Sequence, residues 1–246
     1  MGITSNTLDF EDEVIEKAGF EWNKIRMCEL GSQLMVNGKI SSKAYYILKK
    51  NVIEHVSLDL NGLYGSLIVD LCLPVHESFF NRFHLITNYG TTEHVNNQYQ
   101  VFKNIHDMCK VKGVMIHVLP IPDNWPNHCR YYYPRNFFDE LAKLCNYEII
   151  KIVLKNAFKP PKPKKMLVFV AFYKQTNEEF ISKMTFKTLN IVDTKVLRRV
   201  GNYSLQKDYQ IYILRLIRIF KAHILGKILF ERLFKQLYRK YYDLRH

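Results

Sequence analysis

The chain has 246 residues, of which 48% are hydrophobic and 24% charged, and its formal net charge is +13. This length predicts one domain with an extension, and the composition is that of a globular protein with a well-buried core. No transmembrane helix is expected, because no run of about 18 apolar residues occurs. The acidic start MGITSNTLDFEDEV lacks an apolar stretch, so we expect no secretory signal.

Five cysteines are scattered along the chain without CxxC spacing: Cys28, Cys72, Cys109, Cys129 and Cys145. An odd and dispersed set argues against a disulfide framework and for reduced thiols in the core. Such cysteines are typical of a reducing compartment. We therefore predict a cytoplasmic protein.

Apolar periodicity predicts alternating helices and strands. In chain order we expect a helix at 8–18, a strand at 24–28, a helix at 41–51, strands at 56–58, 67–69 and 83–87, a helix from about 92 to 110, a strand at 114–118, a helix at 134–145, and strands at 147–154 and 166–173. The spacing between the second and third strands is too short for the usual connecting helix. Short apolar runs separated by helices indicate a mostly parallel sheet.

Polar residues stand where these strands end. The first strand runs into Glu29 and Gly31, the second ends at Asp59 and the third at Asp70, and the fourth leads into the block NYGTTEH at 88–94. In an open parallel sheet, ligands bind beyond the carboxyl ends of the strands. These residues therefore lie where such a fold binds its ligand.

Carboxylates at these positions suit a nucleoside. The ribose hydroxyls and the exocyclic amine of a nucleoside donate hydrogen bonds, and carboxylates only accept them. A glycine such as Gly31 lets the backbone approach a ligand, because no side chain intervenes. The strand ends thus carry groups that match a nucleoside ligand.

These motifs resemble those of the Rossmann-like (class I) S-adenosylmethionine-dependent methyltransferases, over roughly residues 24–173. The resemblance implies an α/β fold, with a mostly parallel sheet and an antiparallel edge strand. In that family the first acid–glycine loop holds the methionine end of the cofactor, the acid after the second strand takes the ribose hydroxyls, and the acid after the third lies by the adenine. Carried over, binding of S-adenosylmethionine falls on Glu29, Gly31, Ser32, Asp59, Asp70, Leu71, Asn88, Tyr89, Gly90 and Glu93.

The resemblance also implies methyl transfer to a small-molecule or sugar-like substrate. A Glu-His pair early in the helix after the fourth strand is common among members that act on small molecules. The first loop departs from the family, because it reads ELGSQLMVNG, with Gly31 alone until Gly38, where the family has two or three glycines. The alternative is a non-catalytic binding protein on the same scaffold.

Two histidines are candidates for proton transfer, His94 first and His128 second, because imidazole titrates near neutral pH. A helix residue without chemistry is the competing interpretation of His94. The loop at 120–133 is rich in aromatic and polar groups and forms either a substrate wall or an ordinary surface loop. His117, His128 and Cys129 fit no common metal spacing, so we predict no metal site and interpret His117 as a core histidine.

The end of the chain is set apart by its charge. We place a methyltransferase-like domain at 1–175 and a basic helical extension at 176–246. Residues 207–246 contain ten lysines and arginines against three acids, with apolar residues at helical steps. We expect these helices to pack on the domain or to form a homo-oligomer. Peripheral contact with a membrane is the second interpretation, and nucleic acid is the third.

Overall fold

The computed structural model describes residues 3–35, 40–157 and 165–195 of the chain. The predicted basic helices within 206–246 lie outside the described residues. All described residues belong to one compact unit. Within these residues, no helix combines the length and the apolar character that crossing a membrane requires.

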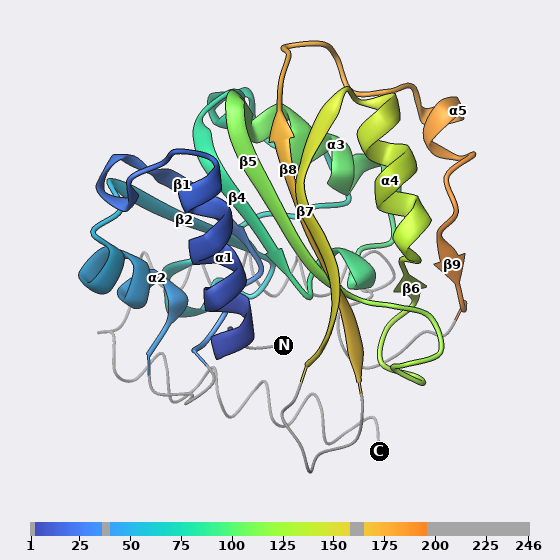
Figure 1. The fold of residues 1–246 in the computed structure, drawn as a ribbon, viewed down its shortest axis with the longest axis horizontal. Coiled ribbons are helices and arrows are strands. Elements are labelled where there is room, and N and C mark those ends of the chain that lie inside the picture. The colour runs from blue at the N-terminus through green and yellow to red at the C-terminus, as the bar shows by residue number, and fades with distance from the viewer. Residues whose placement is uncertain (1–2, 36–39, 158–164, 196–246) are drawn as a thin grey trace, which may run out of the picture. The chain divides into compact units, whose positions relative to one another are not determined.

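Seven strands form the central sheet in the order β3-β2-β1-β4-β5-β8-β7 (Figure 1). They are β1 (Arg26–Leu30), β2 (Glu54–Asp59), β3 (Leu67–Ile68), β4 (Phe83–Tyr89), β5 (Cys109–Pro120), β7 (Tyr147–Asn156) and β8 (Met166–Lys174). The first five are parallel, whereas β8 runs antiparallel between β5 and the outermost strand β7. The predicted α/β class with a mostly parallel sheet is confirmed, and the strand order changes direction between β1 and β4.

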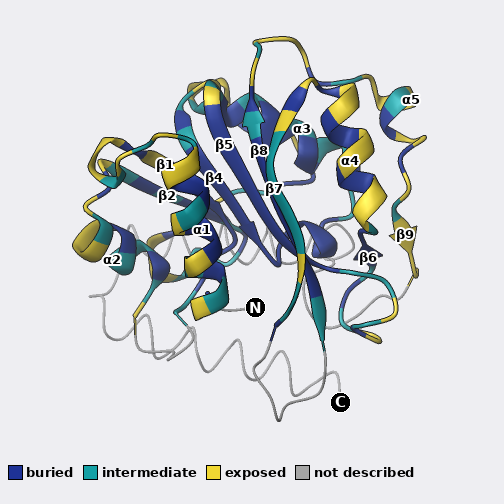
Figure 2. Ribbon diagram, in the orientation of Figure 1, coloured by how far each residue is buried: buried dark blue, intermediate teal, exposed yellow. Residues whose placement is uncertain are grey.

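Helices cover both faces of this sheet. They are α1 (Ser5–Lys17), α2 (Ser42–Tyr45), α3 (Gln98–Met108), α4 (Arg135–Leu144) and α5 (Lys183–Phe186). α1 buries Phe10 and Val14 in the core on one face, and α3 and α4 bury Phe102 and Phe137 in the core on the other. The central strands are accordingly buried along most of their length (Figure 2). All five cysteines are buried and free, as predicted for reduced core thiols.

Single helical turns connect several of these elements: η1 (Trp22–Lys24), η2 (Tyr46–Lys50), η3 (Leu63–Gly65), η4 (Glu77–Phe79) and η5 (Thr92–His94). The turn η3 stands where a helix usually joins the second and third strands, which confirms the expectation that this helix is missing. The predicted helix at 41–51 is present as α2 followed by the wider turn η2, and Ser41 caps it by accepting a hydrogen bond from the backbone of Ala44 at 3.2 Å.

The predicted helix at 92–110 is wrong at its start. Residues Thr92–His94 form the separate turn η5, the backbone at Val95 is extended, and α3 begins at Gln98. The side chain of Gln98 donates to the carbonyls of Thr92 and Val95, at 2.8 and 2.6 Å, and so takes acceptors that a continuous helix would use. The Glu93-His94 pair therefore stands on a turn directly beyond β4.

The segment after β8 packs on the same core. Phe180, Phe186 and Leu189 are buried among the residues of α3 and α4. The short strand β9 (Val192–Asp193) pairs antiparallel with β6 (Tyr131–Tyr132). The predicted domain boundary at residue 175 therefore falls within this unit.

Candidate functional site

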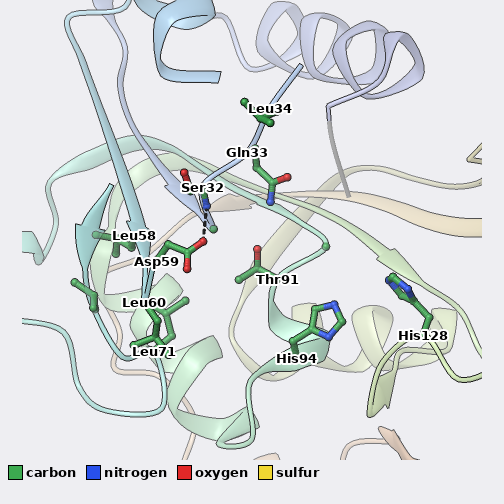
Figure 3. Close-up of a pocket in the computed structure, with 13 residues that line it drawn as sticks. Ser32, Gln33, Leu34, Leu58, Asp59, Leu60, Leu71, Thr91, His94 and His128 are labelled. Atoms are coloured by element: carbon green, nitrogen blue, oxygen red, sulfur yellow. Dashed lines mark hydrogen bonds between the residues drawn. The ribbon is translucent and has the colours of Figure 1, made fainter. Parts of the chain in front are cut away.

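A cleft of about 330 Å³ lies at the carboxyl ends of the parallel strands (Figure 3). Its lining residues are Gly31, Ser32, Gln33, Leu34, Leu58, Asp59, Leu60, Val69, Leu71, Gly90, Thr91, His94 and His128. They come from the ends of β1, β2, β3, β4 and β5 and the loops that follow. This is where an open α/β sheet binds its ligands, at the point where the strand order reverses.

The loop after β1 approaches the cleft with bare backbone. Gly31 has a φ of +81°, and its N–H donates to the carbonyl of Leu58 at 2.8 Å. A Cβ at this position would lie 2.6 Å from Oγ1 of Thr91 and 2.9 Å from Nε2 of Gln33. Oγ1 of Thr91 is itself fixed, because it donates to the carbonyl of Leu30 at 2.8 Å. Both the positive φ and the lack of space therefore require glycine.

Asp59 ties the ends of β1 and β2 together at the cleft. One carboxylate oxygen, Oδ2, accepts a hydrogen bond from the backbone N–H of Ser32 at 2.8 Å (Figure 3). The other, Oδ1, accepts from the backbone N–H of Asn61 at 3.1 Å. A carboxylate has about four acceptor sites. Asp59 can therefore hold both loops and still accept hydrogen bonds from a ligand in the cleft.

Glu29 lies beneath the first loop and does not line the cleft. Its side chain is fully buried within β1, and its Oε2 accepts hydrogen bonds from the hydroxyls of Ser42 at 2.6 Å and Ser57 at 3.1 Å. The same oxygen lies 3.5 Å from the backbone nitrogen of Gln33. Burial raises the pKa of Glu29 to about 7. We expected Glu29 to contact the ligand directly, but the structure places it inside the strand. The strand continues to Leu30, one residue past the acid.

Asn88 is likewise buried behind the cleft and shapes the turn beyond β4. Its Oδ1 accepts hydrogen bonds from the backbone N–H groups of Thr91 and Thr92 at 3.3 and 3.2 Å, and its Nδ2 donates to Oγ1 of Thr92 at 2.9 Å. Nδ2 also lies 3.0 Å from Nδ1 of His117. Burial lowers the pKa of His117 to about 3, so this histidine is neutral. The interpretation of His117 as a core histidine is confirmed.

Two further predicted cofactor residues do not line the cleft. Tyr89 belongs to the core beneath α1. Asp70 lies between Val69 and Leu71, which do line it. Oδ1 of Asp70 accepts the backbone N–H of Cys72 at 2.9 Å, while Oδ2 is buried and accepts no hydrogen bond from the described residues. Next to the cleft wall, Asp70 thus holds an acceptor oxygen that no donor among the described residues occupies.

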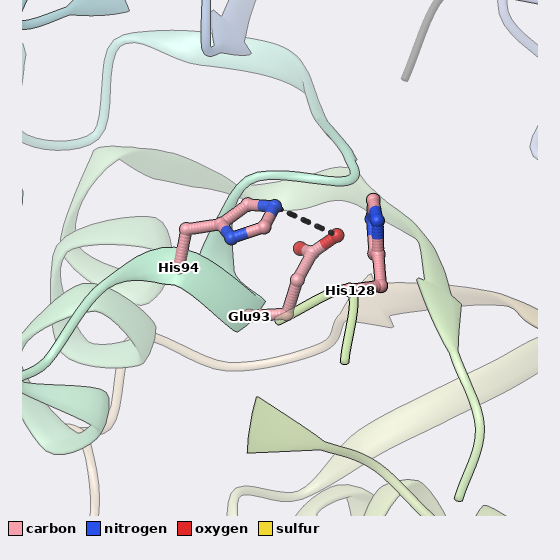
Figure 4. A group of neighbouring side chains, drawn as sticks. All are labelled: Glu93, His94 and His128. Atoms are coloured by element: carbon pink, nitrogen blue, oxygen red, sulfur yellow. Dashed lines mark ion pairs between the residues drawn. The ribbon is translucent and has the colours of Figure 1, made fainter. Parts of the chain in front are cut away.

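Glu93, His94 and His128 converge at one end of the cleft (Figure 4). Nε2 of His94 lies 3.8 Å from Oε1 of Glu93, and the rings of the two histidines lie edge to face with centroids 5.4 Å apart. Glu93 is fully buried, and burial raises its pKa to about 7. Both histidines line the cleft, whereas Glu93 does not.

The aromatic loop after β5 serves mainly as structure. Trp125 donates its ring N–H to the carbonyl of Met166 at 2.7 Å, and the hydroxyl of Tyr131 donates to the carbonyl of Asn96 at 3.1 Å. Of the described residues in this loop, His128 is the one that lines the cleft. Of the loop that we considered as a substrate wall, His128 is therefore the part that borders the cleft.

Comparison with known proteins rests on structure, because no family model and no curated protein matches the sequence. The chain is similar to 1,6-didemethyltoxoflavin-N1-methyltransferase of Burkholderia thailandensis, solved with 1,6-didemethyltoxoflavin and S-adenosylhomocysteine bound. The TM-score is 0.51 at 11% identity, over 68% of this chain and 77% of that one. The chain has the fold of the class I methyltransferases. This confirms the fold that the sequence motifs predicted.

Two other solved structures are similar over comparable parts of the chain. The trans-methyltransferase CalH, in complex with S-adenosylhomocysteine, has a TM-score of 0.47 at 12% identity, over 66% of this chain and 54% of that one. The [4+2]-cyclase SpnF has a TM-score of 0.49 at 12% identity, over 69% and 81%. A shared fold does not determine the reaction, which has to be argued from the site.

Within this methyltransferase fold, the structure adds cleft residues that the sequence did not indicate: Gln33, Leu34, Leu58, Leu60 and Val69. Each lies within two residues of a predicted position along the chain. Thr91 also lines the cleft, and it stands in the predicted block at 88–94. The apolar residues gave no signal in the sequence, because leucine and valine at a strand end are equally expected in the core.

Proposed function

We propose that this protein is a methyltransferase that uses S-adenosylmethionine and acts on a small molecule bound in the cleft. The observation that carries the proposal is the meeting of the Gly31 loop and the Asp59 carboxylate in one cleft, on a class I methyltransferase fold. The structural neighbour from Burkholderia thailandensis binds both a small molecule and S-adenosylhomocysteine. The class of acceptor proposed here follows from that likeness.

The residues of the cleft fit the cofactor. There is no space for a side chain at position 31, so glycine is required there. Its bare backbone can border the methionine end of the cofactor. Asp59 accepts the ribose hydroxyls, and the buried Oδ2 of Asp70, which accepts no hydrogen bond from the described residues, is a candidate acceptor for the adenine amine. Leu71 and Leu60 supply apolar walls for the base.

Alignment is the main task of the protein in such a reaction. S-adenosylmethionine supplies a methyl group that its sulfonium already activates. The cleft has to hold the acceptor atom in line with that methyl group and keep water out. His94 and His128 border the cleft at the end reached from β4 and β5, where they can take up the proton that a hydroxyl or amine acceptor loses.

A non-catalytic binding protein is the second candidate. It is favoured by the first loop, in which Gly31 stands alone where the family has two or three glycines. A binding protein would bind the cofactor or another nucleoside without turnover. Incubation with S-adenosylmethionine and a panel of hydroxyl and amine acceptors, followed by mass spectrometry for S-adenosylhomocysteine, separates the two candidates.

The cofactor assignment predicts a specific loss of affinity in Asp59→Asn. The amide can still accept one backbone hydrogen bond, but it replaces a charged acceptor for the ribose, and hydrogen bonds to charged groups contribute about 1.5–3 kcal/mol each. We expect the Kd for S-adenosylmethionine to rise about 10–100-fold, measured by isothermal titration calorimetry.

Asp139→Asn is the matched control. Asp139 is exposed on α4, does not line the cleft, and forms an ion pair with Arg135 at a distance of 3.6 Å. This variant should bind the cofactor as the wild type does. Equal affinities of wild type and Asp59→Asn would contradict the assignment of Asp59. If neither wild type nor variant binds the cofactor, the proposed function itself is wrong.

A further inference from the structure

We propose that Glu93, His94 and His128 form a binding site for one divalent transition-metal cation, such as Zn²⁺, whose remaining coordination positions face the cleft. The site is new with respect to the sequence, which predicted no metal. Two of its three ligands are the histidines that we first considered for proton transfer. Its role in catalysis rests on the proposed function, but its existence as a cation site does not.

The first argument is convergence. Glu93 and His94 are adjacent on the turn η5, and His128 comes from the loop after β5, yet one ligand atom of each lies within 4.8 Å of the others. Figure 4 shows the carboxylate between the two imidazole rings. Ligand atoms around Zn²⁺, with bonds of about 2.0–2.2 Å, lie about 3–3.5 Å apart. In the proposed site, the three side chains turn toward one another to close this gap when the cation binds.

The second argument is the state of Glu93. Its side chain is fully buried, and neither carboxylate oxygen accepts a hydrogen bond from another described residue. Buried carboxylates are normally paired, hydrogen-bonded or bound to a metal, because the charged form is costly to desolvate. The oxygens of Glu29, which is equally buried, contrast with this, since one of them accepts two serine hydroxyls. A cation at the cluster would compensate the charge of Glu93.

The third argument is the chemistry of the donors. Two imidazoles and one carboxylate are the ligands of catalytic zinc sites and of mononuclear iron(II) sites, whereas Mg²⁺ and Ca²⁺ favour sets made of oxygen. Three protein ligands leave at least one position open. His94 and His128 border the cleft together with Gly90 and Thr91, so an open position on their side is accessible to a molecule bound there.

Such a cation would orient the methyl acceptor. A hydroxyl oxygen bound to it loses its proton more readily, because the cation stabilises the oxygen anion. The oxygen lone pair then forms the bond to the methyl carbon while the sulfur–methyl bond breaks, the sulfonium becomes a thioether, and the acceptor proton passes to water. The transfer needs no oxidant or reductant. The inference thus names hydroxyl compounds as the acceptor class within the proposed function.

The test is a titration of the full chain with Co²⁺ after treatment with a chelator. Bound Co²⁺ with nitrogen ligands absorbs in the visible range, which gives a readout independent of activity. We expect one equivalent of Co²⁺ per chain at this site, and we expect Zn²⁺ to displace it. Absence of any visible band beyond that of aqueous Co²⁺ in the wild type at excess Co²⁺ would overturn the proposal.

Variants assign the binding to these three residues. Glu93→Gln keeps the shape of the side chain and removes its charge, and His128→Ala removes a ligand from a loop. Loss of a hydrogen-bond partner behind a metal ligand already costs about 10–100-fold in metal affinity, so we expect at least about 100-fold for each variant. His76→Ala is the control, since His76 is an exposed histidine whose ring contacts Ser78. If Glu93→Gln does not fold, His128→Ala decides, and affinities equal to that of the wild type refute the site.

Calorimetry with S-adenosylmethionine on the same cobalt-free samples separates this inference from the proposed function. Binding of the cofactor without any cobalt site removes the metal inference and leaves the cofactor assignment intact. A cobalt site lost in His128→Ala, in a protein that binds no S-adenosylmethionine, supports the metal inference and refutes the proposed function. Retention of the cobalt site in both ligand variants shows that the cation binds elsewhere on the chain.

Discussion

Gly31→Ala is expected to lower the free energy of unfolding by about 2–5 kcal/mol, the sum of two costs. A side chain at a φ of +81° costs roughly 1–2 kcal/mol, because Cβ approaches the carbonyl oxygen. Forcing a methyl group to within 2.6 Å of Oγ1 of Thr91 costs a further 1–3 kcal/mol or so, as overpacking does elsewhere. Chemical denaturation followed by circular dichroism measures this loss.

The same substitution should weaken binding of S-adenosylmethionine by at least about tenfold, because relief of the contact moves the loop that borders the cleft. Isothermal titration calorimetry on the folded variant measures this effect. Gly19→Ala is a close control. Gly19 has a φ of +71°, but a Cβ there would meet nothing within 4 Å. That variant should show the backbone cost alone and normal cofactor affinity.

A second variant isolates the steric part of the effect. Thr91→Ala removes Oγ1 and leaves Cβ of Thr91 at 3.7 Å, an ordinary contact distance. On its own it loses the hydrogen bond to the carbonyl of Leu30, worth about 0.5–1.5 kcal/mol. The double variant with Gly31→Ala should therefore be more stable than the sum of the two single effects predicts. If Gly31→Ala matches Gly19→Ala in stability and cofactor affinity, the steric account of the loop is wrong.

The sequence predicted the sheet well because each strand is a short apolar run that ends at a polar or turn residue. Asp59 illustrates this, since it is the last residue of β2 and lines the cleft as expected. Glu29 illustrates the limit. An acid in the buried part of a strand contradicts the rule that such positions are apolar, and the hydroxyls of Ser42 and Ser57, from other elements, are its main hydrogen-bond donors. Those partners cannot be inferred from local pattern.

The cluster of Glu93, His94 and His128 was not predicted from the sequence, for a related reason. Metal spacings are recognisable when the ligands lie on one element, whereas here the third ligand comes from a loop beyond the neighbouring strand. The burial of Glu93 and His94 could not be predicted either. The same two letters in a sequence fit the exposed start of a helix and a buried turn equally well. The side chain of Gln98 contributes to the difference, because it takes up carbonyl groups at the turn that a continuous helix would use.

The second large expected effect is the pH dependence of stability that Glu11 causes. Its sign is opposite to that of most surface carboxylates. It lies on α1, is fully buried, and its two oxygens accept the hydroxyl of Tyr46 at 3.0 and 2.8 Å. Burial raises the pKa of Glu11 from 4.5 to about 8, against the hydrogen bonds from Tyr46; the charge of Asp12 raises it further and that of Lys50 lowers it. The folded protein therefore holds a proton on Glu11 that the unfolded chain releases.

This shift makes the folded state lose stability as the pH rises. The contribution of the protonated carboxyl is fully present below about pH 4.5, the value for the unfolded chain, and it is lost progressively up to about pH 8. Each pKa unit corresponds to about 1.4 kcal/mol, so the loss is on the order of 4–5 kcal/mol. Glu11→Gln keeps the size and an acceptor oxygen but does not titrate. It should match the wild type at pH 4.5 and exceed it by several kcal/mol at pH 8.

Urea denaturation of both proteins between pH 4.5 and 8 measures this difference. Glu29 titrates in the same range, but it contributes equally to both proteins, so the difference between them reports Glu11 alone.

Glu13→Gln, on the same helix, is the control of opposite sign. Ion pairs with Lys151 and Lys17 lower the pKa of Glu13 to about 2, so this variant should be less stable than the wild type at neutral pH and should match it only when the pH falls through that value. A constant difference between Glu11→Gln and the wild type across the range would mean that Glu11 is ionised in the folded protein, and that the Tyr46 hydroxyl and nearby Lys50 outweigh its burial.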